Sequence, residues 1–394
     1  MTDVAAAEAK SPRIESVDSL RGLVIVIMAL DHVRDYTSIV RFDPLDPEQT
    51  NWALYLTRWI THFCAPVFVF LAGTAAGFQR HKGKSAGALS WFLLTRGLWL
   101  IVLELTVVAL GWTFEFQPGG FLQVIWAIGV SMVVLAALVH LPLALIAAFG
   151  AVLVFGHNIF PPTSFGGFDA PETDPANIVA MLLHQSGLAQ IGPATLFIAY
   201  PLIPWIGVMA LGYVFADLYR LDATARRSLL LRSGVAVTAA FFALRGLNLY
   251  GDPGPWSEHG SAGRTIMSFF NTTKYPPSLS FLLMTLGPAL IVLSLAERWK
   301  GPLHDFFVVF GRVPLFFYIL HIYLAHAVAV GLGMTQGFEA KSLMTFFAFF
   351  PESYGVGLAG VYLIWTAVVA ALYLPCRWFG AAKSRSKSWW MAYF

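Results

Sequence analysis

The chain has 394 residues, of which 57% are hydrophobic and 12% are charged, and its mean hydropathy is +0.68. Soluble domains carry about 25% charged residues, so this composition excludes an ordinary soluble protein and indicates a chain embedded in a membrane. The formal net charge of +3 is too small to indicate a nucleic-acid partner. Because Cys64 and Cys376 are the only cysteines, we expect no disulfide framework, and no pattern predicts a metal site.

Ten apolar segments are long enough to cross a bilayer, so the expected fold class is all-α, a polytopic integral membrane protein of about ten transmembrane helices. We place these helices at residues 20–40, 52–79, 88–111, 121–139, 142–157, 194–217, 228–248, 278–297, 305–332 and 356–379. The apolar segment 341–350 is too short to span and predicts an interfacial or re-entrant piece.

The distribution of Lys and Arg predicts the orientation of these helices. With the N-terminus inside, cytoplasmic segments hold fifteen of the 25 Lys and Arg residues, outer loops hold four, and six lie within or at the ends of helices. This bias fits the positive-inside rule with both termini cytoplasmic. We expect one domain over residues 1–394, with a cytoplasmic N-terminal segment at 1–19, no cleaved signal peptide, and a basic cytoplasmic tail at 380–394.

The first predicted helix carries a polar cluster after its apolar stretch, made of Asp31, His32, Arg34, Asp35 and Tyr36. These residues lie nine or more positions past Gly22, about 14 Å or more into the apolar layer. Ionisable groups at such depth are costly and are usually functional. For Arg34 and Asp35, neutralisation of the aspartate charge by the arginine within the helix is a simpler explanation than a functional role. Asp31 beside His32 instead predicts a general base with a carboxylate that fixes its tautomer.

Later helices carry further candidates. Arg58 and His62 lie one turn apart, and Pro66 follows one turn later, which favours a cavity wall over a packing histidine. Arg96 and Glu104 lie two turns apart, and a structural ion pair explains them equally well.

The later part of the chain adds residues on the outer side. Lys274 and Tyr275 precede a Pro-Pro pair at the outer rim, where Lys274 either points into a cavity or snorkels to the interface. In the ninth predicted helix, Tyr318 and His321 share one face, and Arg312 lies two and a half turns before His321. Candidates from helices one, two, three and nine are all placed at mid-depth or further out. We therefore expect one polar pocket open to the outer side.

The motif R-x-x-S-x-D-x-x-R-G, formed by Arg13, Ser16, Asp18, Arg21 and Gly22, resembles the heparan-α-glucosaminide N-acetyltransferase family, and more closely its bacterial relatives. The segments 65–73, 204–213 and 312–321 are also similar to segments of that family. The likeness runs in order along nearly the whole chain, although only the first motif is specific.

The resemblance implies a transmembrane acyltransferase, here of a bacterial inner membrane, that takes acetyl-CoA or another acyl-CoA from the cytoplasm and acylates a glycan or amino sugar on the outer side. By analogy, Asp31 replaces the family's polar residue of helix one, and Tyr318 with His321 replaces its late pair. The chain departs from the family at 41–51, where a family histidine is absent. His32 or His62 would then serve as the base.

On this hypothesis, Asp31 orients the base, and Tyr318, His321 or Lys274 donates to the oxyanion. The expected acceptor contacts are Arg58, Glu104, Lys274, Tyr275 and Arg312, and the expected CoA contacts are Arg21 and Arg96, with Arg13 and Arg232 also available. A proton-coupled transporter that uses the same buried Asp and His residues is the alternative. The sequence leaves open the acceptor, a direct or acyl-enzyme route, and the oligomeric state, including a homodimer.

Overall fold

The structure is a computed structural model that describes residues 14–116, 119–160, 170–386 and 388–394. It is mostly helical. Seven helical segments are long and apolar enough to cross a membrane: Trp52–His81, Ala86–Thr113, Leu202–Arg220, Ala223–Leu247, Leu279–Ala296, Pro314–Thr335 and Leu358–Arg385. These segments confirm a polytopic membrane protein.

The α-helices are α1 (Glu15–Thr37), α2 (Trp52–Trp59), α3 (Cys64–His81), α4 (Ala86–Leu103), α5 (Ala109–Thr113), α6 (Val124–Leu138), α7 (Leu143–Gly156), α8 (Pro175–His184), α9 (Leu202–Phe215), α10 (Ala223–Leu247), α11 (Ala262–Phe270), α12 (Leu279–Ala296), α13 (Pro302–Gly311), α14 (Pro314–Thr335) and α15 (Leu358–Arg385). The strands are β1 (Gly119–Leu122), β2 (Gly187–Ile191) and β3 (Ala194–Ile198).

The all-α expectation is wrong in one respect, because the three strands form a small sheet in the order β1-β3-β2. β2 and β3 are antiparallel and are joined by a tight turn at Gly192, whose φ of 57° suits glycine. β1 pairs with β3 in parallel. Consequently, the helices expected at 121–139 and 194–217 both begin as strands.

Three further boundaries differ from expectation. The helix expected at 305–332 is interrupted between α13 and α14, where Pro314 opens the new helix. The helix expected at 52–79 contains a 3₁₀ turn, η1 (Ile60–Phe63), just before Pro66, whose ring disfavours the regular bond to the carbonyl four residues earlier. α1, α6 and α7 are not among the seven segments, so the count of ten spans remains a prediction. The segment 341–350 forms two short 3₁₀ turns, as expected for a piece that does not span.

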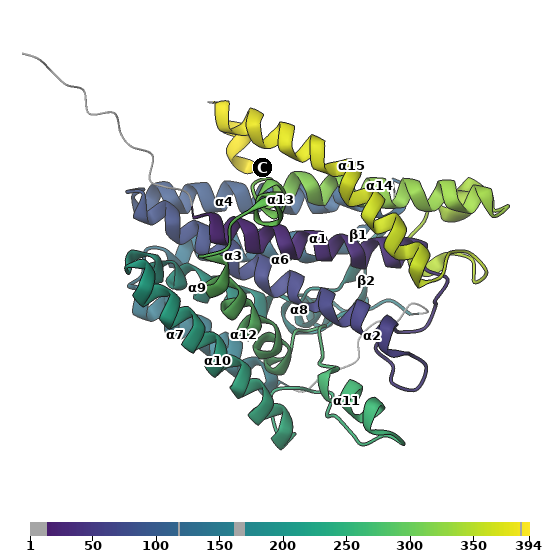
Figure 1. Ribbon diagram of the computed structural model, residues 1–394, viewed down its shortest axis with the longest axis horizontal. Coiled ribbons are helices and arrows are strands. Elements are labelled where there is room, and N and C mark those ends of the chain that lie inside the picture. Colours follow the sequence, from purple (N-terminus) through teal and green to yellow (C-terminus); the bar gives the residue numbers. More distant parts are fainter. Residues whose placement is uncertain (1–13, 117–118, 161–169, 387) are drawn as a thin grey trace, which may run out of the picture.

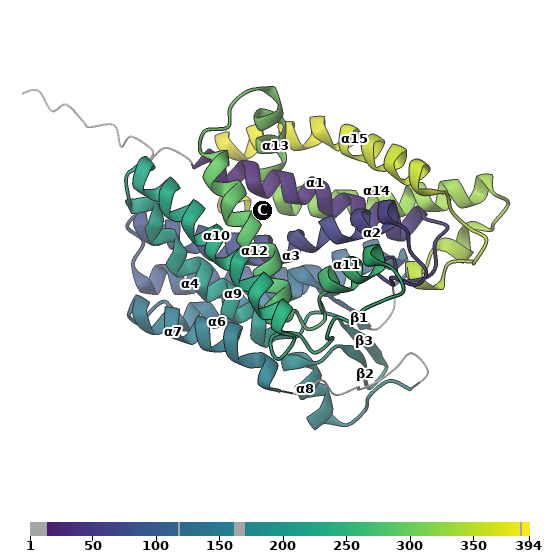
Figure 2. The same ribbon diagram turned by 60° about the horizontal axis from the view of Figure 1, so that its bottom comes forward.

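Helix α1 runs through the middle of the molecule, with α14 and α15 on one side and α3 on the other (Figure 1). It contacts α3, α12, α13, α14 and α15. As a result even its polar residues Asp31, His32 and Arg34 are buried. Figure 2 shows the sheet together with α2 and α11 at one end of the helical body.

Glycines bring the central helices into backbone contact. A Cβ atom at Gly22 of α1 would lie 1.8 Å from the carbonyl oxygen of Phe307, and one at Gly311 of α13 would lie 1.8 Å from that of Asp18. The same reciprocal arrangement occurs between α3 and α9 at Gly73 and Gly212. Small residues at such crossings allow close van der Waals packing, which drives helix association in membranes.

The contact at Gly22 yields a stability prediction. Gly22→Ala must push α1 away from α13, and we expect it to destabilise the protein by about 1–3 kcal/mol, as overpacking does elsewhere. Thermal unfolding in detergent should show the loss as a lowered Tm. Gly87→Ala in α4 is the matched control, because a Cβ atom there meets nothing within 4 Å. Equal Tm values for the two variants would contradict the proposed contact.

Candidate active site

A cavity of about 330 Å³ lies where α1, η1, α3 and the sheet meet. One wall is ionic and contains Asp31, Arg34, Asp35 and Arg58. Arg58 Nη1 donates to both oxygens of Asp31 at 2.7 and 2.8 Å, and the hydroxyl of Thr61 donates to the same carboxylate at 2.9 Å. Arg34 Nη2 lies 2.6 Å from both Asp31 and Asp35. These charges therefore neutralise one another, which lowers the cost of burying them.

His32 also lines this cavity, which we call the outer cavity. Its Nδ1 lies 2.7 Å from Nε2 of His321, and the two imidazole rings stack with centroids 4.9 Å apart. His321 Nδ1 lies 3.0 Å from the carbonyl oxygen of Phe317, one turn earlier in α14. α1 and α14 thus build a chain of hydrogen bonds that ends on a main-chain carbonyl.

This chain fixes the protons of the two neutral imidazoles. The Phe317 carbonyl can only accept, so His321 carries its proton on Nδ1 and offers a lone pair at Nε2. His32 Nδ1 must then donate to His321. The lone pair of His32 is left on Nε2, which has no hydrogen-bond partner among the described residues. His32 is therefore oriented as a proton acceptor, and the residue that orients it is His321 rather than Asp31.

Two hydrogen-bond donors flank the His32 ring. The Trp112 and Tyr318 rings both meet it edge-on, with centroids 5.0 and 6.2 Å away. Within the described residues, Trp112 Nε1 and the Tyr318 hydroxyl are buried without a well-formed hydrogen bond. Tyr36 fixes the Trp112 backbone by donating to its carbonyl oxygen at 3.1 Å. Buried donors of this kind suit an oxygen that gains negative charge beside the base.

Another part of the lining is aromatic. Phe121 of β1 stacks on Phe197 of β3 at 4.9 Å and meets Phe346 edge-on at 5.1 Å. Lys274, Tyr275 and Tyr200 also line the cavity. Burial raises the pKa of Tyr200 well above its ordinary value, so this phenol stays neutral. The outer cavity thus offers a flat apolar surface facing charged and hydroxyl groups.

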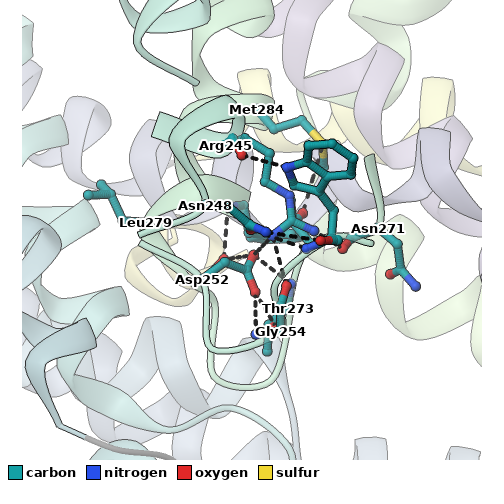
Figure 3. Close-up of polar contacts among 12 residues, drawn as sticks. Arg245, Asn248, Asp252, Gly254, Asn271, Thr273, Leu279 and Met284 are labelled. Atoms are coloured by element: carbon teal, nitrogen blue, oxygen red, sulfur yellow. Dashed lines mark hydrogen bonds and ion pairs between the residues drawn. The ribbon is translucent and has the colours of Figure 1, made fainter. Parts of the chain in front are cut away.

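The loop that carries Lys274 and Tyr275 is anchored by Arg245, at the end of α10 (Figure 3). Arg245 is 2% exposed and donates to the main-chain carbonyls of Gly254, Ser268, Phe269 and Asn271 at 2.8–3.2 Å. Asp252 lies 3.6 Å from the guanidinium and accepts from Thr273 and Ser278. One buried arginine therefore ties both ends of the loop to α10.

A second cavity of about 410 Å³, the inner cavity, lies toward the other end of α1. Its lining includes five cationic side chains and, among the described residues, no Asp or Glu side chain: Arg21, Lys84, Arg96, Arg312 and Lys383. Some of these cations have acidic neighbours outside the lining, such as Asp18 beside Arg21 and Glu15 beside Arg312, both at 3.2 Å. The deeper lining is apolar and includes Ile25, Leu100 and Ile128.

The two cavities are adjacent. Met28 of α1, Phe68 of α3 and Val124 of α6 line both of them, and we call these three residues the junction. His32 lines the outer cavity and Tyr318 lines the inner one. The candidate base and its neighbouring hydroxyl donor therefore lie on opposite sides of a thin apolar partition.

Several expected site residues lie elsewhere. His62 is fully buried in η1 against Phe281, lines neither cavity, and has no hydrogen-bond partner on either ring nitrogen among the described residues. Glu104, in a π-helical turn (Glu104–Val108), accepts from the main-chain N–H of Trp126 at 2.8 Å and so caps α6. Arg312 lines the inner cavity rather than the outer one.

Of the two other cations expected near CoA, Arg232 is exposed on α10 and lines neither cavity, and Arg13 lies outside the described residues. Trp112 and the junction residues are not among the site residues expected from the sequence. The spacing of Arg21, Ile25, Met28 and His32 along one face of α1 is the signal that could have traced a path between the cavities.

Comparison with protein families gives one match. The model described as "Heparan-alpha-glucosaminide N-acetyltransferase, catalytic" matches residues 13–250, which is more than half of the chain. The chain belongs to this family. The heparan-α-glucosaminide N-acetyltransferase family uses acetyl-CoA, so membership points to a membrane acyltransferase. The match covers α1 to α10, whereas Lys274, Tyr318 and His321 lie beyond it. No curated protein matches the sequence.

The Arg245 anchor yields a prediction. Arg245→Leu leaves four carbonyls and Asp252 without their cation, so we expect faster proteolysis within 249–277 and a lower Tm, because breaking a buried pair typically costs about 3–5 kcal/mol. Arg232→Leu on the exposed face of the same helix is the control and should behave as the unchanged protein does. Indistinguishable proteolysis of the two variants would rule out the anchoring role.

Proposed function

We propose that this protein is a transmembrane acyltransferase that moves an acyl group from cytoplasmic acyl-CoA, through the junction, to a glycan or amino-sugar acceptor on the outer side. The observation that carries the proposal is the pair of cavities that meet at Met28, Phe68 and Val124 with His32 beside the meeting point. A transferase of this kind needs two compartments that share one reaction centre. The family membership supports the same chemistry.

The inner cavity fits CoA. Five cations around its lining, with no Asp or Glu side chain among the described lining residues, suit a ligand with several phosphates, since Arg and Lys form charge-assisted bonds to phosphate oxygens. The apolar deeper part suits the slender pantetheine arm. Arg21 and Arg96 remain the proposed phosphate contacts, now joined by Lys84, Arg312 and Lys383. The excess of Lys and Arg on this side supports placing it in the cytoplasm, with both termini there.

His32 is the proposed general base. Its Nε2 would take the proton from the acceptor amine or hydroxyl as that group attacks the acyl carbonyl, and His321 would hold the ring and share the positive charge. The ion pairs of Asp31 support this role indirectly. Arg58 and Arg34 bind the Asp31 carboxylate, so it does not compete with His321 for the N–H of the His32 ring.

Tyr318 and Trp112 are the proposed donors to the oxyanion. Both donors are buried beside His32, so they are preorganised where charge develops. When the carbon–sulfur bond breaks, the thiolate would leave toward the inner cavity and take up the proton held by His32. Every proton is then accounted for without a metal ion.

The acceptor would lie in the outer cavity. A pyranose ring can stack on the wall of Phe121 and Phe346 while its hydroxyl groups reach Tyr275, Lys274 and the ionic wall. This arrangement supports an extracytoplasmic glycan or amino sugar. The proposed location is a bacterial inner membrane, which the resemblance of the motif at residues 13–22 to bacterial relatives implies.

The assignment of the base yields a prediction. His32→Gln removes the proton acceptor and should lower the rate of acetyl transfer by about 10²–10⁴-fold. The measurement is CoA release from acetyl-CoA with D-glucosamine, by purified protein in detergent. His62→Gln changes the other candidate histidine, which lines neither cavity. When folded, this variant should retain most of the activity of the unchanged protein. A loss confined to His62→Gln would refute the assignment.

A second prediction concerns the donors. Tyr318→Phe keeps the ring but removes the hydroxyl, and we expect a fall in kcat of about 10²–10³-fold with little change in CoA affinity. Tyr323→Phe is the matched control in the same helix, because its hydroxyl bonds the Val107 carbonyl away from both cavities. A change in CoA affinity alone would show that Tyr318 acts in binding instead.

The inner cavity can be tested by calorimetry with CoA. Arg96→Gln should weaken binding about 10-fold or more, because a hydrogen bond to a charged group contributes about 1.5–3 kcal/mol. The exposed Arg232→Gln should bind CoA as the unchanged protein does. If the unchanged protein neither binds CoA nor releases it from acetyl-CoA, the acyltransferase proposal fails, and proton-coupled uptake into liposomes would then favour the transporter alternative.

A further inference from the structure

The junction separates the two cavities at the level of the candidate base. We propose that Phe68, with Met28 and Val124, limits the size of the acyl group, so that acetyl passes and longer chains are rejected. This inference rests on the proposed function, and it names the residues that choose among acyl-CoA substrates. It follows from where the reacting carbonyl must lie and from what surrounds that point.

The position of the carbonyl follows from the two groups that would act on it. His32 lines the outer cavity, Tyr318 lines the inner cavity, and their rings are 6.2 Å apart. A carbonyl group within reach of both must lie at the partition between the cavities. The carbon atoms attached to that carbonyl then lie against the junction residues.

The junction is apolar and tightly packed. Met28 and Val124 are each almost fully buried, at 5% and 6% exposed, and Phe68 is half-buried. No polar atom of these three side chains competes for the carbonyl. They can therefore recognise an acyl group only by its volume.

Phe68 is the bulky exception on a surface of small residues. Ala65 lines the outer cavity one turn before it on α3, and Ala72 lines the inner cavity one turn after it. Ala75 and Ala76 continue the inner wall. A helix face built from alanine leaves a slot along α3, and Phe68 narrows that slot at the level of the reaction.

This arrangement predicts steep selection by chain length. In a hydrophobic pocket, one additional or missing methylene group of the substrate changes kcat/KM by about 10–200-fold. Shortening Phe68 removes the narrowest wall, whereas shortening a phenylalanine that points elsewhere on the same helix does not. Phe70 is such a residue, because it lines neither cavity and packs on Phe215 with ring centroids 4.7 Å apart.

The test compares acetyl-CoA with butyryl-CoA, with D-glucosamine as acceptor and CoA release as the readout, in purified full-length protein. Phe68→Ala should raise the ratio of butyryl to acetyl kcat/KM at least 10-fold over the unchanged protein, while Phe70→Ala should leave this ratio unchanged. Met28→Ala widens the same partition from α1 and should shift the ratio in the same direction. It serves as the second variant if Phe68→Ala does not fold.

The outcomes separate the two proposals. Acetyl-CoA turnover by the unchanged protein tests the proposed function by itself. If that turnover is present, and Phe68→Ala and Met28→Ala bind CoA but keep the original ratio, the size limit does not lie at the junction and the inference is overturned. An equal rise in Phe68→Ala and Phe70→Ala would also overturn it, because it would reflect general loosening of α3.

Discussion

The ion pairs of Asp31 with Arg58 and Arg34 are the constraint on which the site depends. A carboxylate inside a membrane protein is tolerated only when it is paired and hydrogen-bonded, and here two guanidinium groups and the Thr61 hydroxyl meet that requirement. Since Asp31 and Arg58 come from different helices, the pair also fixes α1 against α2. Helix α1 must therefore hold His32 at one level and in one direction relative to α14.

This constraint accounts for the difference in lining charge between the cavities at the two ends of α1. Near the outer end, positive and negative groups balance one another and the cavity also has a broad aromatic wall. Near the inner end the lining is cationic. A polyanionic donor and a sugar-like acceptor would thus be attracted to opposite ends of the same helix, and they would meet only where the helix is apolar.

Much of this site could be predicted from the sequence, for an identifiable reason. Depth along a helix follows from residue number, so the common level of Asp31, His32 and His321 was accessible without a structure. The direction in which a side chain points from its helix, by contrast, matters only in relation to the neighbouring helices that pack on each face, and these are not known from residue number. For that reason Glu104 was expected in a pocket but caps α6, and His62 was a candidate equal to His32 although it is fully buried and lines neither cavity.

The strands and the pairing of Asp31 with Arg58 were not predicted from the sequence, for the same reason. Short apolar segments such as 194–198 fit a helix and a strand equally well, and only pairing with β1 and β2 decides between them. The Lys and Arg bias, by contrast, is a property of whole segments, and it agrees with a cationic cavity at one end of α1. Properties summed over many residues were predictable, whereas contacts between single side chains were not.

The glycine crossings have a consequence for how such a protein can change over evolution. At Gly22, Gly73, Gly212 and Gly311 the distance between helices is set by main-chain atoms, which no substitution can shorten and almost any substitution would lengthen. The spacing of these helices is therefore fixed, while the side chains that face the cavities are free to vary. New substrates can be acquired by exchanging a few lining residues, and the architecture can persist across enzymes that have little else in common.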